Sequence, residues 1–190
     1  MLRNVVVVVG LGFLFVTGCA SPRGKSIAQK RDYVEHMRET TLQLAEAKEP
    51  AVAARAKNAA GYGVFSNIGF ALIFGGGGNG YGVVVDNNTG EKTYMRMLRA
   101  SGGLGIGVKE FKVIVTFHDR ETLDKFVSKG WEFGGEASAA ATTGEKGGEA
   151  RTVGSMSRGI EVYEMTDRGV YIRAALQATK VYPDKKLNQG

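Results

Sequence analysis

The segment Gly69–Val85 reads GFALIFGGGGNGYGVVV, and the rest of the chain must fold around it. Both ends are apolar and typical of strands, whereas the middle is rich in glycine: Gly75, Gly76, Gly77, Gly78, Gly80 and Gly82. Each glycine loses more backbone entropy on folding than any other residue, so such a run is expected where a turn or a close approach of backbones requires it. We therefore predict a glycine-rich structural loop at the turn of a hairpin of tightly packed strands.

A second interpretation of this run is a loop whose backbone N–H groups bind an anion. No Gly-Lys-Ser or Gly-Lys-Thr follows it, so it is not a Walker A loop. The segment Tyr81–Val85 that follows is typical of a strand, whereas nucleotide-binding glycine motifs open a helix. Nucleotide binding is therefore disfavoured, although a secondary contact of the backbone amides with a lipid stays open.

The composition indicates one ordinary domain with appendages. The chain has 190 residues, of which 28 are glycine and 3 are proline, and this favours a sheet with glycine-rich packing over a collagen-like polymer. The net charge of +6 is spread along the chain, so it suits an anionic membrane surface as well as simple solubility. No dense basic block interleaved with aromatic residues is present, and we expect no nucleic-acid partner.

The N-terminus has the pattern of a bacterial lipoprotein signal. Arg3 precedes the apolar segment Val5–Val16, which is too short for a permanent membrane span and typical of a signal-peptide core. The segment ends in Val16-Thr17-Gly18-Cys19, which resembles a lipobox. We predict a signal peptide over residues 1–18, lipid attachment at Cys19 and a tether over residues 19–26. The alternative is a free thiol, since a single cysteine cannot form a disulfide framework.

The residue after the cysteine suggests where the protein resides. Ala20 stands there instead of aspartate, and by resemblance to Gram-negative lipoproteins this favours the outer membrane, with the domain facing the periplasm. Acyl chains stabilise membrane residence by about 0.8 kcal/mol per buried methylene, so a multiply acylated cysteine is a durable anchor.

The helix predictions come from periodicity and capping residues. Ile27–Lys48 is amphipathic, with Val34, Met37, Thr41, Leu44 and Ala45 at helical spacing. Pro50 suits the first turn of a second helix over Pro50–Ala60, with Gly61 as its C-cap. Asp119 is expected to cap a third helix, Arg120–Lys129, that ends at Gly130.

The strand predictions come from alternation between turn residues. The expected strands are Gly69–Phe74, Tyr81–Val85, Glu91–Met97, Phe111–Phe117, Ala137–Ala141 and a hairpin of Ile160–Met165 with Val170–Leu176. Residues 183–190 read as a polar tail without fixed structure. The fold class predicted is α+β, a largely antiparallel glycine-rich sheet or partly closed barrel with N-terminal helices and one inserted helix.

No set of residues in the sequence assembles an active site. His36 and His118 are the only histidines, and no serine lies in a Gly-x-Ser-x-Gly context. No His-x-x-x-His or Cys-x-x-Cys pattern is present, so a transition-metal site has no ligand set. We predict a protein that is not an enzyme and has no catalytic residue, metal or cofactor, with a hydrolase using His118 as the alternative.

Three segments together carry a resemblance to a known family. They are Ala56–Phe65 (AKNAAGYGVF), the glycine run Gly75–Gly82 and Gly102–Gly107 (GGLGIG), and Phe117, Phe126, Gly130-Trp131 and Tyr163 continue the pattern in order. The chain resembles the SYLF lipid-binding family over about residues 50–182. We therefore expect a SYLF-like domain over residues 27–182.

The resemblance implies binding of anionic phospholipids through a basic front segment and the glycine-rich domain. The candidate lipid-binding residues are Lys25, Lys30, Arg31, Arg38, Arg96, Arg99, Lys109 and Lys112. The function predicted is a lipid-anchored cell-envelope protein that binds phospholipids at the membrane surface. The alternative is a structural or adaptor lipoprotein that binds another envelope protein without specific lipid recognition.

Overall fold

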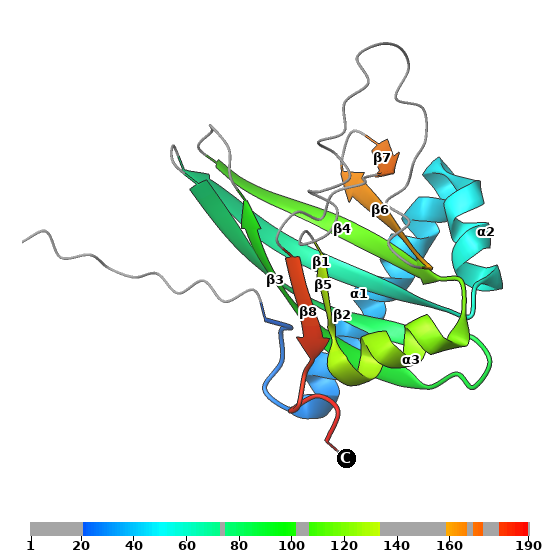
Figure 1. Cartoon of the computed structure of the whole chain (residues 1–190). Coiled ribbons are helices and arrows are strands. Elements are labelled where there is room, and N and C mark those ends of the chain that lie inside the picture. Colours follow the sequence, from blue (N-terminus) through cyan, green and yellow to red (C-terminus); the bar gives the residue numbers. More distant parts are fainter. Residues whose placement is uncertain are drawn as a thin grey trace, which may run out of the picture.

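The computed structural model describes residues 21–72, 75–101, 107–133, 159–166, 169–172 and 179–189. One curved sheet lies between helices α1 and α2 on one face and helix α3 on the other (Figure 1). The elements are α1 (Ile27–Lys48), α2 (Pro50–Asn58), β1 (Gly61–Leu72), β2 (Gly75–Asp86), β3 (Lys92–Ser101), β4 (Gly107–Phe117), α3 (Arg120–Lys129), β5 (Trp131–Phe133), β6 (Ile160–Thr166), β7 (Gly169–Ile172) and β8 (Thr179–Pro183).

The sheet is antiparallel throughout its described pairs, in the order β5-β8-β3-β2-β1-β4-β6-β7. Arg99 on β3 and Glu164 on β6 are separated by β2, β1 and β4, which is about 19 Å along a flat sheet. Their side chains nevertheless approach to 3.7 Å. The sheet is therefore curled into a half-barrel, and the predicted α+β class with a partly closed barrel is confirmed.

Helix α1 has the bounds that the sequence predicted. Ser26 and Gln29 form a reciprocal capping box, in which Ser26 Oγ accepts from Gln29 N at 3.2 Å. The helix buries a stripe of Val34, Met37, Thr41 and Ala45 against the sheet. Leu44 was expected in this stripe, but it is 39% exposed because the stripe turns away from it toward Ala45.

Helix α2 is shorter than predicted. It begins at Pro50, but its last residue is Asn58 and its C-cap is Ala59 in extended conformation. Gly61 is the first residue of β1 instead of a helix cap. A Cβ at Gly61 would lie 2.7 Å from Val85 O and 2.8 Å from Leu123 Cδ2, so this glycine is required by close packing of β1 against β2 and α3.

The two faces of the sheet bury two separate cores. The outer face, under α1 and α2, carries Tyr62, Val64, Tyr81, Val83, Tyr94, Ile114 and Tyr163. The inner face, under α3, carries Phe65, Met95, Met97, Phe111, Val113, Val115 and Phe117. Phe126 of α3 lies at the centre of the inner core, with its ring centroid 4.8 Å from that of Phe117 and 6.4 Å from that of Phe65. The predicted alternation of Phe111–Phe117 is confirmed.

The glycine run forms strand β2, and the expectation of a loop is corrected. Alternation places Gly78, Gly80 and Gly82 on the inner face, where we call them the glycine stripe. A Cβ at Gly82 would lie 2.4 Å from Phe65 Cδ1, and one at Gly78 would lie 2.5 Å from Asn67 Oδ1. The glycines therefore make room for two side chains of β1 that lie flat across β2.

Helix α3 and the aromatic residues after it agree with the sequence. Asp119 caps the helix by accepting from Thr122 N at 2.7 Å, and Gly130 ends it at a φ of 77°, in the region that favours glycine. Trp131 and Phe133 of β5 pack partly buried against the inner core.

The segment after β8 is packed instead of free. Leu187 is buried, and Asn188 Oδ1 accepts from Tyr94 N at 2.8 Å while its Nδ2 donates to Tyr94 O at 2.8 Å. The expected polar tail is therefore held against β3 because Asn188 completes the hydrogen bonding of a strand residue.

Several expectations lie outside the described residues. They are the signal peptide of residues 1–18, Cys19, the strand Ala137–Ala141 and much of the segment Val170–Leu176. Within the described ranges, no helix combines the length and the apolar character that a membrane crossing needs.

Candidate functional site: a basic corner, an outer apolar pair and a polar cleft

Two predicted basic residues of α1 are already engaged within the fold. Arg31 donates from Nε to Leu187 O at 2.8 Å, and its guanidinium lies 5.5 Å from the ring centre of Tyr94. Arg38 donates to Tyr62 Oη at 2.9 Å and to Glu35 Oε2 at 3.1 Å. These two residues therefore fasten α1 to the sheet and to the C-terminal segment.

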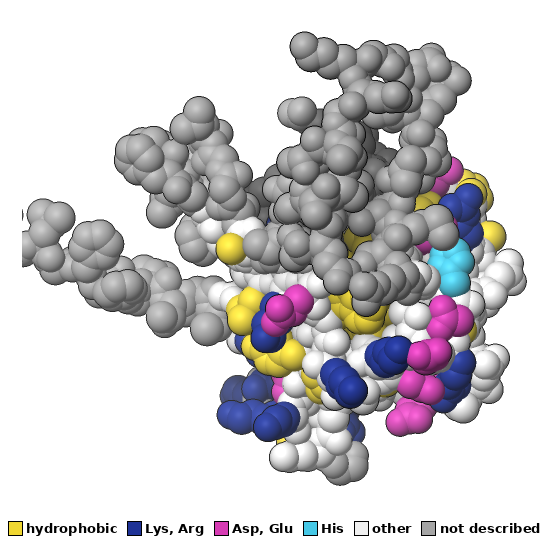
Figure 2. Space-filling view, viewed as in Figure 1, with side chains coloured by type: hydrophobic (Ala, Val, Ile, Leu, Met, Phe, Trp, Pro, Cys, Tyr) yellow, Lys and Arg dark blue, Asp and Glu magenta, His cyan; other side chains and the backbone are white. Residues whose placement is uncertain are grey.

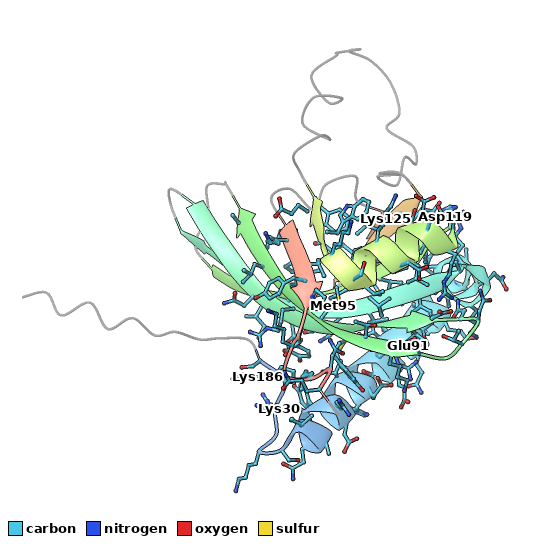
Figure 3. All side chains as sticks on the ribbon, turned by 60° about the horizontal axis from the view of Figure 1, so that its bottom comes forward. Lys30, Glu91, Met95, Asp119, Lys125 and Lys186 are labelled. Atoms are coloured by element: carbon cyan, nitrogen blue, oxygen red, sulfur yellow. The ribbon has the colours of Figure 1, made fainter. Side chains whose placement is uncertain are left out.

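The start of α1 and the segment after β8 form one basic corner. We define the basic corner as Arg23, Lys25, Lys30, Lys185 and Lys186, of which Lys30 is partly exposed and the others are exposed. Figure 3 shows Lys30 and Lys186 at the same end of the molecule. Figure 2 shows Lys and Arg side chains gathered at that end, at the lower left of the view, with hydrophobic side chains directly above them. Only Lys25 and Lys30 of this group were candidates from the sequence.

Two apolar side chains project from the outer face of the sheet nearby. Ile68 of β1 and Leu98 of β3 are 41% and 42% exposed, and both stand opposite Asn79 of β2. We call Ile68 and Leu98 the outer apolar pair. Arg23 lies over the ring of Tyr33, and its charge helps lower the pKa of Glu110, which pairs with Ile68 in register. Arg23, in the segment that precedes α1, thus lies near this pair.

Lys112 belongs to a hydrogen-bonded cluster on the same face. Its Nζ donates to Ser66 Oγ at 3.0 Å and to Glu110 Oε1. The hydrogen bond from Lys112 is the main reason that the pKa of Glu110 is lowered. Burial raises the pKa of the neighbouring Tyr81. Ser66 is buried and already hydrogen-bonded to both Lys112 and Glu110. The cluster therefore stabilises the outer face and does not present a free nucleophile.

The remaining predicted residues are dispersed. Arg96 lies 3.8 Å from Asp184, beside the basic corner. Arg99 points into the half-barrel, where it contacts Glu164 and lies 4.7 Å from the ring centre of Phe111. Lys109 is in β4, and its side chain is outside the described part of the structure. The candidates therefore divide between the basic corner, the outer cluster and the interior.

A polar cleft of about 400 Å³ opens between α2, β4 and β6. It is lined by Arg55, Asn58, Ala59, Thr116, His118 and Glu161. Arg55 Nη1 donates to Tyr163 Oη at 3.0 Å, and His118 Nε2 lies 3.4 Å from Glu161 Oε1. Burial is the largest cause that raises the pKa of Tyr163, which donates to Glu161.

The cleft resembles a general acid–base site only in part. His118 and Glu161 lie 3.4 Å apart, but none of the described residues that line the cleft is a serine or cysteine. The hydrolase alternative therefore finds its histidine without a serine or cysteine nucleophile in this lining. Among the described residues, no group of His, Cys, Asp and Glu side chains has the arrangement of a metal site. Arg55 and Tyr163 were not singled out from the sequence, because only the folded sheet brings α2 next to β6.

The fold and these surfaces define the structural class of the chain. The chain forms an α+β half-barrel that carries the basic corner and the outer apolar pair near residues 21–26. Residues 98–190 match the family model described as Ysc84, "Las17-binding protein actin regulator". The resemblance to the SYLF (Ysc84) family that the sequence predicted is thereby confirmed. The family supports a lipid-binding or adaptor-type role.

A curated relative extends the similarity over most of the chain. "Beta cell expansion factor A" of Aeromonas veronii is 29% identical over 165 residues, which are 87% of this chain and 61% of the relative. The chain thus spans about three fifths of the length of that relative.

Proposed function

We propose that this protein binds anionic phospholipids at the surface of the membrane to which it is tethered. The observation that carries the proposal is the position of the basic corner and the outer apolar pair. Both lie at the end of the fold where residues 21–26 lead into α1, so a chain anchored at Cys19 presents these surfaces to the bilayer.

The energetics of such a surface suit reversible head-group binding. A Lys or Arg near an anionic membrane contributes about 1 kcal/mol, and this attraction falls off within about 10 Å at 0.1 M salt. Asp32 and Asp184 near the corner offset part of the positive charge. Ile68 and Leu98 add burial of apolar surface at about 25 cal/mol per Å² removed from water. The corner therefore complements a lipid anchor without replacing it.

The proposed location is the outer membrane of a bacterial envelope, with the domain in the periplasm. This rests on the lipobox ending at Cys19 and on Ala20 after it. Radiolabelled palmitate incorporated into the full chain, and absent from a Cys19→Ala variant, is the expected result. Labelling of both proteins, or of neither, would contradict lipid attachment at Cys19.

Co-sedimentation with liposomes tests the binding surface. Residues 20–190 without the lipid should sediment with vesicles containing phosphatidylglycerol and remain in solution with vesicles of pure phosphatidylcholine. The variant Lys25→Glu with Lys186→Glu should lose at least tenfold in affinity, because both changes lie in the basic corner. The matched control Lys57→Glu with Lys129→Glu makes the same change in charge elsewhere and should stay within twofold of wild type.

The liposome result can refute the proposal in two ways. Equal sedimentation, or none, with both vesicle types would remove anionic lipid recognition. Equal losses of affinity in the two charge variants would show that vesicle binding depends on the net charge of the protein and not on the basic corner.

A second candidate function is an adaptor that binds another envelope protein. The exposed outer apolar pair favours this function, because a protein partner can bury apolar side chains at the core of an interface just as a lipid bilayer can. A photo-crosslinking residue at position 98 in intact cells should then yield one defined protein adduct. Adducts with lipid alone would favour the membrane role.

A further inference from the structure

A layer of polar side chains lies inside the half-barrel, next to the apolar inner core. It consists of Asn67 on β1, Arg99 on β3, Glu164 on β6 and Thr179 on β8, and we call it the inner polar layer. Alternation along each strand places these residues on the same face as Phe65, Met97, Val162 and Val181 of the inner core. Arg99 contacts Glu164, its backbone pairs with Thr179 and with Gly78, and the amide of Asn67 lies over Gly78, so the four residues are neighbours on the inner face.

Asn67 is the least satisfied member of this layer. Its side chain is fully buried, and neither Nδ2 nor Oδ1 has a hydrogen-bond partner in the part of the chain that the structure describes. The amide lies over the glycine stripe, where a Cβ at Gly78 or Gly80 would come within 2.5 Å of Oδ1 or 3.0 Å of Nδ2. β2 therefore leaves room for the amide of Asn67, which no described residue pairs by a hydrogen bond.

Thr179 provides a second unsatisfied group. It is 1% exposed, and its Oγ1 has no hydrogen-bond partner among the described residues. Its backbone pairs with Arg99 on one side and with Phe133 on the other. Buried polar atoms are nearly always hydrogen-bonded in folded proteins, and exceptions call for an explanation such as a bound group. Asn67 and Thr179 together offer donors and acceptors of both kinds.

The charges of the layer compensate each other. Arg99 lies 3.7 Å from Glu164, and its guanidinium lies over the ring of Phe111. The side chains next to this pair, Met97 and Val113, are apolar and fully buried. An additional charge would find no free counter-charge among the described side chains around this pair and would lose its hydration on entry. The layer therefore favours an uncharged group that both donates and accepts hydrogen bonds.

We propose that the inner polar layer is a binding site for an uncharged hydroxyl- or amide-bearing group, held by Asn67 and Thr179 beside the Arg99–Glu164 pair. This chemistry occurs in the head of a neutral single-chain lipid and in a free polyol, and experiment distinguishes these two sources. The site lies on the inner face of the sheet, so it is separate from the basic corner and does not depend on the membrane role of that corner.

The test uses the full chain in detergent that contains no glycerol, with native mass spectrometry as the readout. The probes are monoolein, which has an uncharged glycerol head, free glycerol, and oleate, which has the same chain and a charged head. Wild type should retain one monoolein per chain and bind oleate at least tenfold more weakly. Saturation with glycerol alone would assign the site to a free polyol and would support the same chemistry.

Two variants connect the binding to the layer. Asn67→Leu keeps the volume but removes the amide, so monoolein binding should fall at least tenfold while the melting temperature without probe stays equal or rises. Asn79→Leu makes the same change on the outer face and should bind as wild type. If Asn67→Leu does not fold, Thr179→Val removes one hydroxyl at similar shape and should also weaken monoolein binding.

The proposal fails if wild type binds none of the three probes, or if oleate binds as well as monoolein. It also fails if the folded Asn67→Leu or Thr179→Val protein binds monoolein as tightly as wild type. Sedimentation of Asn67→Leu with anionic liposomes should match wild type, so failure of the interior site and failure of the membrane role are distinguishable.

Discussion

Each face of the sheet carries a buried core, but the polar groups of the two faces are paired differently. On the outer face, tyrosine hydroxyls meet charged partners from the helices, as in Arg38 to Tyr62 and Arg55 to Tyr163. On the inner face, aromatic rings and the glycine stripe surround Asn67, whose amide has no partner among the described residues. The outer face thus fastens helices through polar contacts at its rim, whereas the inner face depends on shape. The inner face should therefore be the less tolerant of changes in volume.

The largest effect is expected at the centre of the inner core. Phe126→Ala should lower the free energy of unfolding by about 3–5 kcal/mol, because the ring is fully buried and contacts four other aromatic rings. Urea denaturation followed by Trp131 fluorescence measures this change. The control Leu44→Ala, at an exposed position of α1, should cost less than about 1 kcal/mol. Similar costs for the two variants would contradict the central position of Phe126 in the inner core.

Adding one methyl group to the glycine stripe should have the next largest effect. Gly82→Ala places a Cβ 2.3 Å from Val64 O and 2.4 Å from the ring of Phe65, so backbone must shift. Overpacking of this kind costs about 1–3 kcal/mol. Gly77→Ala, which alternation places on the outer face at a partly exposed position, should change stability by less than about 0.5 kcal/mol. A stability of Gly82→Ala equal to wild type would show that the stripe has free space.

A smaller effect is expected where a polar contact fastens the outer face. Tyr62→Phe removes the hydroxyl that accepts from Arg38 at 2.9 Å and leaves the ring in place. The expected loss is about 0.5–1.5 kcal/mol, the usual net contribution of one hydrogen bond. Thermal unfolding of this variant and of Arg38→Leu, alone and combined, measures the coupling. Strict additivity of the two changes would mean that the contact contributes nothing.

The smallest effect should appear as a pH dependence at Asp86. Burial alone would raise the pKa of this carboxyl, but hydrogen bonds from Asn88 and Thr89 and the charge of Arg120 outweigh burial, so its pKa is lowered from 3.8. A lowered pKa contributes stability above the unfolded value of about 4, and this contribution is lost as pH falls through the folded value.

Asp86→Asn keeps an oxygen acceptor for the turn and removes the charge. Wild type should exceed the variant by about 0.5–1 kcal/mol between pH 5 and 7, since Arg120 is half exposed, and the difference should shrink below about pH 4. Chemical denaturation at several pH values measures it. A difference that grows on acidification would reverse the assigned sign.

The sequence predicted most of what depends on local signals. Helical periodicity predicted the bounds of α1, and Asp119 and Gly130 predicted those of α3. The alternation of Phe111–Phe117 identified one face of β4 because strand side chains alternate whatever the neighbours are.

The features that the sequence missed depend on partners that are distant along the chain. The glycine run was expected in a turn, because nothing local indicates that Phe65 and Asn67 of β1 lie across it. Arg99 was a candidate for the surface, since its pairing with Glu164 exists only once the sheet curls. Only Lys25 and Lys30 of the basic corner were predicted, whereas Lys185 and Lys186 reach α1 only through the packing of Leu187 and Asn188.

The anchoring of the segment after β8 sets the path along which a mechanical load enters the domain. A pull on Ser21 reaches α1 first, where Arg31 is bonded to Leu187 O and, at 3.2 Å, to Gln189 O. Asn188 in turn holds this segment to Tyr94 of β3. Tension from the N-terminal side is therefore distributed from α1 to β3 through the C-terminal segment and to β1 through the contact of Arg38 with Tyr62.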